Sequence, residues 1–284
     1  MNPDLKIIEN IKKNIINNEL NKTVAIDDPV LSEEEIDKLI DKYNNLKKNK
    51  IKYSIDKKAS QAMIKTTCKD VYDNIEFKGI EKLNNLNTGA IITGNHYSPV
   101  DTIPIKELIK KVFNKELYIV SYASNLALKP PLDFIVNHEN IIPIKDSISY
   151  LNEVFKPQLF DLLNKGEFVL IYPEQEMWNN YRKPRPCKRG AYQFAAEANV
   201  PIISLYTELK DRGIKDNNNF NKLKYILHVI DIIEQDNNLS VRQNSINNSK
   251  KDYELKVKKY EECFNKKLTY DFSYEDIAGL QKEE

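Results

Sequence analysis

Hydrophobic residues recur along this chain with two different periods, and the period changes near residue 70. Before that point the apolar residues stand at helical spacing, as the isoleucines of residues 7–15 do, and Gly and Pro are almost absent. Ser32 and Glu35 have the spacing of a capping box, which is typical of a helix start. The pattern therefore predicts a helical N-terminal region over residues 1–70.

From residue 71 to residue 284, short β-branched apolar runs alternate with helical stretches. This alternation predicts an α/β domain of three layers, in which a mixed, mostly parallel sheet of about seven strands is flanked by helices. The expected strands are 75–78, 89–93, 117–122, 140–144, 167–172, 201–207 and 224–232. The expected helices are 102–113, 148–164, 188–198 and 250–267, and the Asn-rich stretches 214–222 and 235–250 are expected to be loops.

Composition narrows the possible functions. The 284 residues include 43 Lys plus Arg and 42 Asp plus Glu, and this balance argues against a dedicated nucleic-acid-binding protein. Three widely separated Cys predict neither a disulfide framework nor a Cys-based zinc site. The N-terminus lacks the features of a signal peptide, and apolar runs such as 168–172 are too short to span a membrane. We therefore expect a cytoplasmic location without a transmembrane helix, and any membrane contact to be peripheral, on the inner membrane face.

The segment Gly94-Asn95-His96-Tyr97-Ser98-Pro99-Val100-Asp101 contains the strongest candidate for catalysis. It follows a hydrophobic strand, and open α/β sheets bind ligands at the carboxyl ends of their strands. Asp101 stands where the next helix needs an N-cap, and a turn at Pro99 would bring its carboxylate to His96. A carboxylate on one ring nitrogen lets the other take a proton from a hydroxyl. A structural hydrogen bond between the two side chains is the alternative.

Four blocks of the chain, taken in order, resemble those of the glycerolipid acyltransferases, which act on glycerol 3-phosphate and 1-acylglycerol 3-phosphate. The blocks cover about residues 75–235, outside the helical N-terminal region. They are the His-x4-Asp segment at residues 96–101, Ile171-Tyr172-Pro173-Glu174, Lys188-Arg189-Gly190-Ala191 and Val200-Pro201-Ile202-Ile203.

This resemblance implies that His96 is the general base and that Asp101 orients it. The acceptor hydroxyl would attack an acyl thioester directly, and the absence of a Gly-x-Ser-x-Gly motif agrees with the lack of an acyl-enzyme. Glu174 would contact the acceptor, although an ion pair with a nearby Arg is the alternative. The resemblance implies no cofactor, with acyl-CoA or acyl carrier protein as co-substrate.

The chain departs from the family pattern where phosphate is bound. The position of the family's phosphate-binding Arg holds Asp146, with Lys145 beside it, and the Arg expected soon after Glu174 is missing. Three of the chain's five Arg crowd a Pro-rich segment just downstream. We therefore predict that this loop binds the phosphate of the acceptor or donor, the alternative being an ordinary solvated surface loop. The candidate substrate-binding residues are Glu174, Lys145, Arg182, Arg185, Lys188 and Arg189.

The remaining features have structural interpretations. The isoleucine stripe at residues 7–15 either packs on its own domain or lies on a membrane surface. His138 and His228 are interpreted as structural, and the sequence predicts no metal site because neither has a second ligand at close spacing.

Together these features predict an O-acyltransferase of phospholipid biosynthesis, with a glycerophosphate or lysophospholipid acceptor. Its partners would be the acyl thioester, the acceptor and a membrane surface, with no nucleic acid. The alternatives are transfer to a different hydroxyl acceptor, thioester hydrolysis, or a catalytically idle protein of the same fold that binds lipid or acyl carrier protein.

Overall fold

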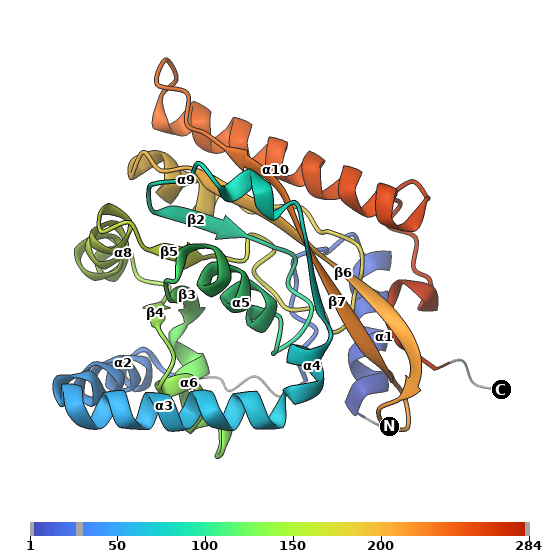
Figure 1. Cartoon of the computed structure of the whole chain (residues 1–284), viewed down its shortest axis with the longest axis horizontal. Coiled ribbons are helices and arrows are strands. Elements are labelled where there is room, and N and C mark those ends of the chain that lie inside the picture. The colour runs from blue at the N-terminus through green and yellow to red at the C-terminus, as the bar shows by residue number, and fades with distance from the viewer. Residues whose placement is uncertain (1–2, 27–30, 282–284) are drawn as a thin grey trace.

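The structure, a computed structural model, describes residues 3–26 and 31–281 and is organised around a seven-stranded sheet (Figure 1). The strand order is β1-β7-β6-β2-β5-β3-β4, and every neighbouring pair is parallel except β6 and β7. The predicted mixed, mostly parallel sheet is therefore confirmed. The strands are β1 (Ile75–Lys78), β2 (Ala90–Thr93), β3 (Leu117–Tyr122), β4 (Ile141–Ile144), β5 (Phe168–Leu170), β6 (Ile202–Lys215) and β7 (Asn221–Ile233).

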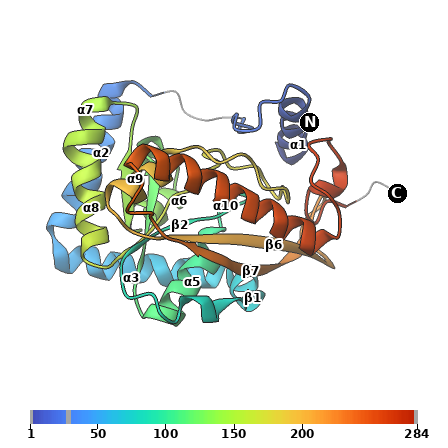
Figure 2. The same ribbon diagram turned by 90° about the horizontal axis from the view of Figure 1, so that it is seen from above.

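Helices cover both faces of the sheet, which gives the three layers that the sequence predicts (Figure 2). The helix α5 lies on one face, and α8, α9 and α10 lie on the other. The helices are α1 (Pro3–Ile16), α2 (Glu33–Lys48), α3 (Lys50–Thr67), α4 (Lys69–Asp73), α5 (Thr102–Phe113), α6 (Leu132–Asn137), α7 (Ile148–Tyr150), α8 (Lys156–Asn164), α9 (Gly190–Glu197) and α10 (Val241–Phe264). Short 3-10 turns are η1 (Ile80–Leu83), η2 (Ala123–Ala127) and η4 (Tyr274–Asp276), and η3 (Leu151–Phe155) is a π-helical turn joining α7 to α8.

The packing of the central strand β2 explains why its first three residues, 90–92, are all apolar. Ala90 and Ile92 pack in the cluster that includes Leu108 of α5, whereas Ile91 packs on the opposite side with Leu159 of α8. Successive side chains of a strand point to opposite faces, so a parallel strand covered on both sides needs an unbroken apolar run. This packing fixes the position of β2, and therefore also the position at which the following loop begins.

The final helix begins earlier than the sequence predicts. We expected a loop over residues 235–250 and a helix over 250–267, but α10 starts at Val241, with Ser240 and Gln243 forming a capping box. The Asn-rich first turns look like a loop because the residues they bury are polar. Asn244 and Asn248 bond with residues 235–239, and Asn248 donates to Gln235 at 3.0 Å.

The strands β6 and β7 extend further than the sequence predicts and form a long antiparallel ribbon. The expected loop at 214–222 is reduced to residues 216–220. This ribbon reaches past the rest of the sheet toward α1 (Figure 1).

The N-terminal helices lie on two sides of the molecule. The stripe of α1 packs against Trp178, Tyr181 and Phe220, so its isoleucines contact the body of the protein. The helices α2 and α3 instead lie near α6, away from α1 (Figures 1 and 2). Within the described ranges, no helix combines the length and the apolar content that crossing a membrane requires.

Candidate active site

The loop after β2 is held in place before it reaches its histidine. The Asn95 side chain is buried and bonds twice to the backbone of Thr207, donating to its oxygen at 3.1 Å and accepting from its nitrogen at 2.8 Å. The amide side chain therefore continues the connection between β2 and β6 beyond their last paired residues, Thr93 and Ser204. The backbone of His96 donates to Glu174 Oε2 at 3.2 Å and accepts from the Trp178 nitrogen at 3.1 Å.

His96 and Asp101 form the pair that the sequence predicts. His96 Nδ1 lies 2.7 Å from Asp101 Oδ2, and the carboxylate is buried while the imidazole side chain is 21% exposed. The turn that brings them together includes a bond from the Asp101 nitrogen to the Ser98 oxygen. No hydrogen bond from the described part of the chain reaches His96 Nε2. This nitrogen can therefore accept a proton from a bound hydroxyl while Asp101 holds the ring.

Asp101 does not cap α5, although it occupies the predicted N-cap position. Its Oδ2 instead accepts from the backbone nitrogens of Tyr97 at 3.1 Å and Ser98 at 3.4 Å, in addition to His96. The carboxylate points back into the loop because these donors precede it in the turn. The local N-cap pattern thus identified the helix start but not the direction of the side chain.

Tyr172 is a third member of the site, and the sequence analysis assigned it no role. Its hydroxyl donates to Asp101 Oδ1 at 2.5 Å, and its ring stacks on His96 with 4.0 Å between centroids and 7° between planes. Burial, followed by the charge of Asp101, raises the pKa of the phenol well above its ordinary value, so it remains a donor. The sequence did contain a signal for this role. Tyr172 comes just after β5, which is parallel to β2 and next to it, and the carboxyl ends of parallel strands lie at the same edge of a sheet.

Glu174 is buried and forms an ion pair with Arg185. Its carboxylate accepts from Arg185 Nη2 at 2.9 Å, Nε at 3.1 Å and the Arg185 backbone nitrogen at 2.9 Å, besides the nitrogen of His96. Burial lowers the pKa of the guanidinium, an effect that Glu174 opposes. Of the two predicted alternatives for Glu174, the structure has the ion pair, which fixes the backbone on which His96 sits.

The N-terminal segment also braces this loop. Asn21 donates to the oxygens of Glu174 and Pro186, and Trp178 Nε1 donates to the Lys22 oxygen at 2.9 Å. Arg185 Nη1 in turn donates to the Leu20 oxygen. The residues after α1 are thus joined to the loop that supports His96.

The basic segment is not the splayed, solvated loop that the sequence suggests. Arg185 is 1% exposed, and Lys183 is 4% exposed and paired with Asp276 at 2.6 Å. Arg182 donates to the oxygens of Leu209 and Glu275 and lies over the ring of Phe264. Three of the clustered cations therefore hold the loop together.

Lys188 and Arg189 differ from those three cations. Both are exposed, and neither forms an ion pair with any residue that the structure describes. They immediately precede α9, and the backbone nitrogen of Lys188 donates to the backbone oxygen of Pro173 at 2.7 Å. These two cations are therefore free to meet a solute next to the strand end that carries Tyr172.

Lys145 lies at the end of β4, and its charge is neutralised. Its ammonium pairs with Asp37 at 2.6 Å and with Glu33 at 3.4 Å, both on α2. The neighbouring Asp146 accepts a hydrogen bond from Tyr122. The position that resembles the family's phosphate-binding Arg thus carries no free positive charge.

A buried polar network ties α10 to the strand that leads to His96. Lys256 and Asp252 are both 0% exposed and pair with each other. Thr93, the last residue of β2, donates to Asp252 Oδ2 at 2.7 Å and accepts from Lys256 at 3.0 Å. Ser204 and Tyr192 also donate to Asp252, so every partner of this charge pair lies inside the fold.

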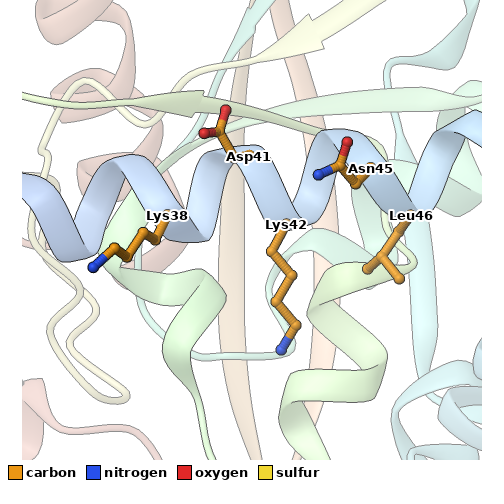
Figure 3. A pocket seen from close by; sticks show the side chains of 5 residues that line it. All are labelled: Lys38, Asp41, Lys42, Asn45 and Leu46. Atoms are coloured by element: carbon orange, nitrogen blue, oxygen red, sulfur yellow. The ribbon is translucent and has the colours of Figure 1, made fainter.

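Two hollows of the described surface lie away from the histidine. One, of about 450 Å³, is lined by residues of α2 alone, where Lys42 and Leu46 point to one side of the helix and Asp41 points to the other (Figure 3). The second, of about 560 Å³, includes Gly89 and Phe168, at the amino ends of β2 and β5. His96 lies at the carboxyl end of β2, so neither hollow is its substrate site.

His138 and His228 have partners inside the protein. His138 Nδ1 bonds to the Phe134 oxygen at 2.7 Å. His228 lies beside Glu208 and Cys263, and these three side chains bring metal-ligand atoms within 4.8 Å of one another. Sequence spacing could not have revealed this cluster, because its members come from β6, β7 and α10.

One comparison with known proteins covers the segment that holds the candidate site. A family model described as Acyltransferase matches residues 74–208, which contain His96, Asp101, Tyr172 and Glu174. No curated protein matches the sequence. Among solved structures, the chain is similar to the crystal structure of the 1-acyl-sn-glycerophosphate (LPA) acyltransferase, PlsC, from Thermotoga maritima. The identity is 13% and the TM-score is 0.49, over 94% of this chain and 98% of that chain. The family-model match supports the resemblance of the sequence blocks, all of which lie within residues 74–208, and it identifies an acyltransferase domain over these residues.

Proposed function

We propose that this enzyme transfers an acyl group from a thioester, acyl-CoA or acyl carrier protein, to the hydroxyl of a glycerophosphate or lysophospholipid acceptor, with His96 as general base. The observation that carries the proposal is the His96–Asp101 pair, in which one ring nitrogen is bonded to a buried carboxylate and the other forms no hydrogen bond with the residues that the structure describes. The pair lies within the matched acyltransferase segment.

The proposed reaction needs no covalent intermediate on the protein. Nε2 of His96 takes the proton of the acceptor hydroxyl as its oxygen attacks the thioester carbon. Asp101 stabilises the imidazolium that forms, and Tyr172 fixes the second oxygen of that carboxylate. The tetrahedral intermediate then collapses, the carbon–sulfur bond breaks, and the imidazolium returns its proton to the leaving thiolate. The acyl ester and the free thiol are the products.

The charge distribution supports a phosphate contact through Lys188 and Arg189. The other three predicted cations are engaged within the protein: Lys145 with Asp37, Arg185 with Glu174, and Arg182 with backbone oxygens. A lysine binds phosphate as a point charge, whereas an arginine can bind it with two parallel hydrogen bonds. We propose that Lys188 binds the phosphate as a point charge and that Arg189 binds it through paired hydrogen bonds, next to the Tyr172–Pro173 segment.

Transfer to a hydroxyl acceptor without phosphate is the second candidate function. It is favoured by one observation: where the family carries a phosphate-binding Arg, this chain has Asp146, which bonds to Tyr122, and Lys145, which is paired. An acceptor recognised by neutral groups would not require a cation there.

The proposal includes peripheral membrane contact, because a lysophospholipid acceptor and the acylated product are lipids. Leu128 and Leu132 are 38% and 54% exposed and flank the exposed Lys129 and prolines 130 and 131. The segment comes after β3 and the turn η2, and β3 runs parallel to β2 through β5, so the chain leaves β3 at the same edge of the sheet as the loop of His96. We propose that it touches the lipid surface. Flotation with anionic vesicles should recover the native chain but less of a Leu128→Ser, Leu132→Ser variant; equal recovery of both would contradict this assignment.

The reaction is tested by incubating the purified chain with a labelled acyl thioester and separate acceptors: glycerol 3-phosphate, a lysophosphatidic acid, a neutral lysophospholipid and a monoacylglycerol. Labelled product from the phosphorylated acceptors supports the proposal. Product from monoacylglycerol alone supports the second candidate. Release of free fatty acid without acceptor indicates a thioesterase, and binding without turnover indicates an idle protein. The His96→Ala variant provides the background rate.

A further inference from the structure

A second cluster of chemically active side chains lies on the long β6–β7 ribbon, under the last turns of α10. Glu208 Oε2 and His228 Nε2 are 3.0 Å apart, and Cys263 Sγ lies 3.6 Å from the same ring nitrogen. All three ligand atoms fall within 4.8 Å of one another. Glu208 and His228 are buried, while Cys263 is partly exposed.

We propose that Glu208, His228 and Cys263 form a binding site for a zinc-type divalent ion, with water as the fourth ligand. Tetrahedral zinc holds nitrogen and oxygen at about 2.0–2.2 Å and sulfur at about 2.3 Å, which places neighbouring ligand atoms about 3.3–3.7 Å apart. The Glu208–His228 and His228–Cys263 separations, 3.0 and 3.6 Å, need to change by only a few tenths of an ångström, and the Glu208 and Cys263 ligand atoms lie within 4.8 Å of each other. The partial exposure of Cys263 leaves water a route to the fourth position.

The donor set selects the class of metal. Calcium and magnesium take oxygen ligands, whereas one imidazole nitrogen, one thiolate and one carboxylate suit zinc and its neighbours in the first transition row. On binding, the thiol of Cys263 loses its proton to solvent, and His228 binds as the neutral ring. Zinc with one thiolate and one carboxylate is then electrically neutral overall, which favours burial.

The surroundings of the cluster are compatible with such a site. Tyr206, Ile230 and Tyr260 form an apolar cluster against which Cys263 packs, so competing water is limited. Lys210 lies 3.2 Å from Glu208 Oε1 and leaves Oε2 directed at His228. Each oxygen of the carboxylate therefore has a separate partner, and the lysine need not leave for the metal to bind.

The site is distinct from the His96 pair but joined to it through one strand. Glu208 follows Thr207, whose backbone holds Asn95. A metal between β6, β7 and α10 would therefore fasten the end of α10 to the strand that supports the catalytic loop. The inference concerns structure and does not depend on which acceptor the enzyme uses.

Cobalt binding tests the inference, because a cobalt–thiolate bond gives a charge-transfer absorption band. Untagged chain, stripped with a chelator and dialysed, is titrated with Co²⁺ under reducing conditions, and zinc is then added to displace it. We expect one ion per chain, the thiolate band, and its loss on displacement. Cys263→Ser should lose the band, whereas Cys68→Ser, which alters a cysteine between α3 and α4, should keep it.

Glu208→Gln retains the cysteine and is the second variant, because it remains informative if Cys263→Ser does not fold. It should retain the band but require more cobalt to reach it. Absence of a band in the native chain, an equal band in Cys263→Ser, or an unchanged titration midpoint in Glu208→Gln would each overturn the proposal. Mass spectrometry of the intact, zinc-loaded chain provides the stoichiometry independently.

Discussion

Replacing Asp101 with Asn removes one charge from the site and little else. The amide oxygen of Asn can occupy the place of Oδ2, where it still accepts from His96 Nδ1 and from the backbone nitrogens of Tyr97 and Ser98. The amide nitrogen then faces Tyr172, whose hydroxyl can rotate to accept from it. We therefore expect the fold and the loop geometry to persist while the imidazolium loses its counter-charge.

The size of the effect follows from the geometry. A unit charge about 4 Å from another is worth about 4 kcal/mol at an effective dielectric constant of about 20. The 21% exposure of the His96 side chain admits some solvent, which reduces this value. If about 3 to 4 kcal/mol of transition-state stabilisation is lost, kcat/KM should fall about 100- to 1,000-fold, because 1.36 kcal/mol corresponds to a factor of ten.

The assay follows release of free thiol from the acyl thioester in the presence of acceptor, beside the melting temperature of each variant. Tyr172→Phe is the matched control, since it removes one hydrogen bond to Asp101 but no charge, and its loss should be much smaller. An Asp101→Asn enzyme that melts like the native chain and retains a third or more of its activity would refute the role of the carboxylate.

Three further outcomes follow from the contacts. Arg185→Met leaves Glu174 buried without its ion-pair partner, so the free energy of unfolding should fall by about 3 to 5 kcal/mol; an unchanged chemical-denaturation midpoint would contradict the buried pair. Gly89→Ala should lower the free energy of unfolding by about 1 to 3 kcal/mol, because the added Cβ would lie 2.4 Å from a backbone oxygen. Gly190→Ala should leave it unchanged, because nothing lies within 4 Å of the added Cβ. Equal denaturation midpoints for the two variants would contradict this packing. Lys188→Ala should raise KM for a phosphorylated acceptor about tenfold with a smaller change in kcat, as expected for the loss of a charged hydrogen bond. Lys145→Ala should leave KM unchanged, because Lys145 is already paired with Asp37. Equal effects of the two substitutions on KM would show that Lys188 does not bind the acceptor.

The strands and most helices could be predicted because their sequence periods report local burial. The first three residues of β2 are apolar since both of its faces are covered, and the capping box of Ser32 and Glu35 marked α2 correctly. The start of α10 could not be predicted in this way, because Asn244 and Asn248 are buried by bonding to other polar groups. A pattern of hydrophobic residues cannot predict a helix whose buried face is polar.

The candidate site was predictable in part for a related reason. His96 and Asp101 are five residues apart, so a turn is enough to bring them together. The charges of two predicted or neighbouring cations are instead neutralised by distant residues: Lys183 of the basic segment by Asp276, and Lys145, after β4, by Asp37 of α2. Tyr172 reaches Asp101 from a separate strand. Such partners depend on the topology of the sheet, which a linear motif does not contain.

The role of His96 as general base is tested most directly by the single-turnover rate of acyl transfer by His96→Gln, measured with enzyme in excess over the thioester. Gln preserves a polar side chain in the loop but cannot take the proton of the acceptor. If His96 is the general base, the rate should fall about 100- to 10,000-fold with the melting temperature preserved. A folded His96→Gln enzyme that transfers the acyl group within a few-fold of the native rate would show that His96 is not the general base.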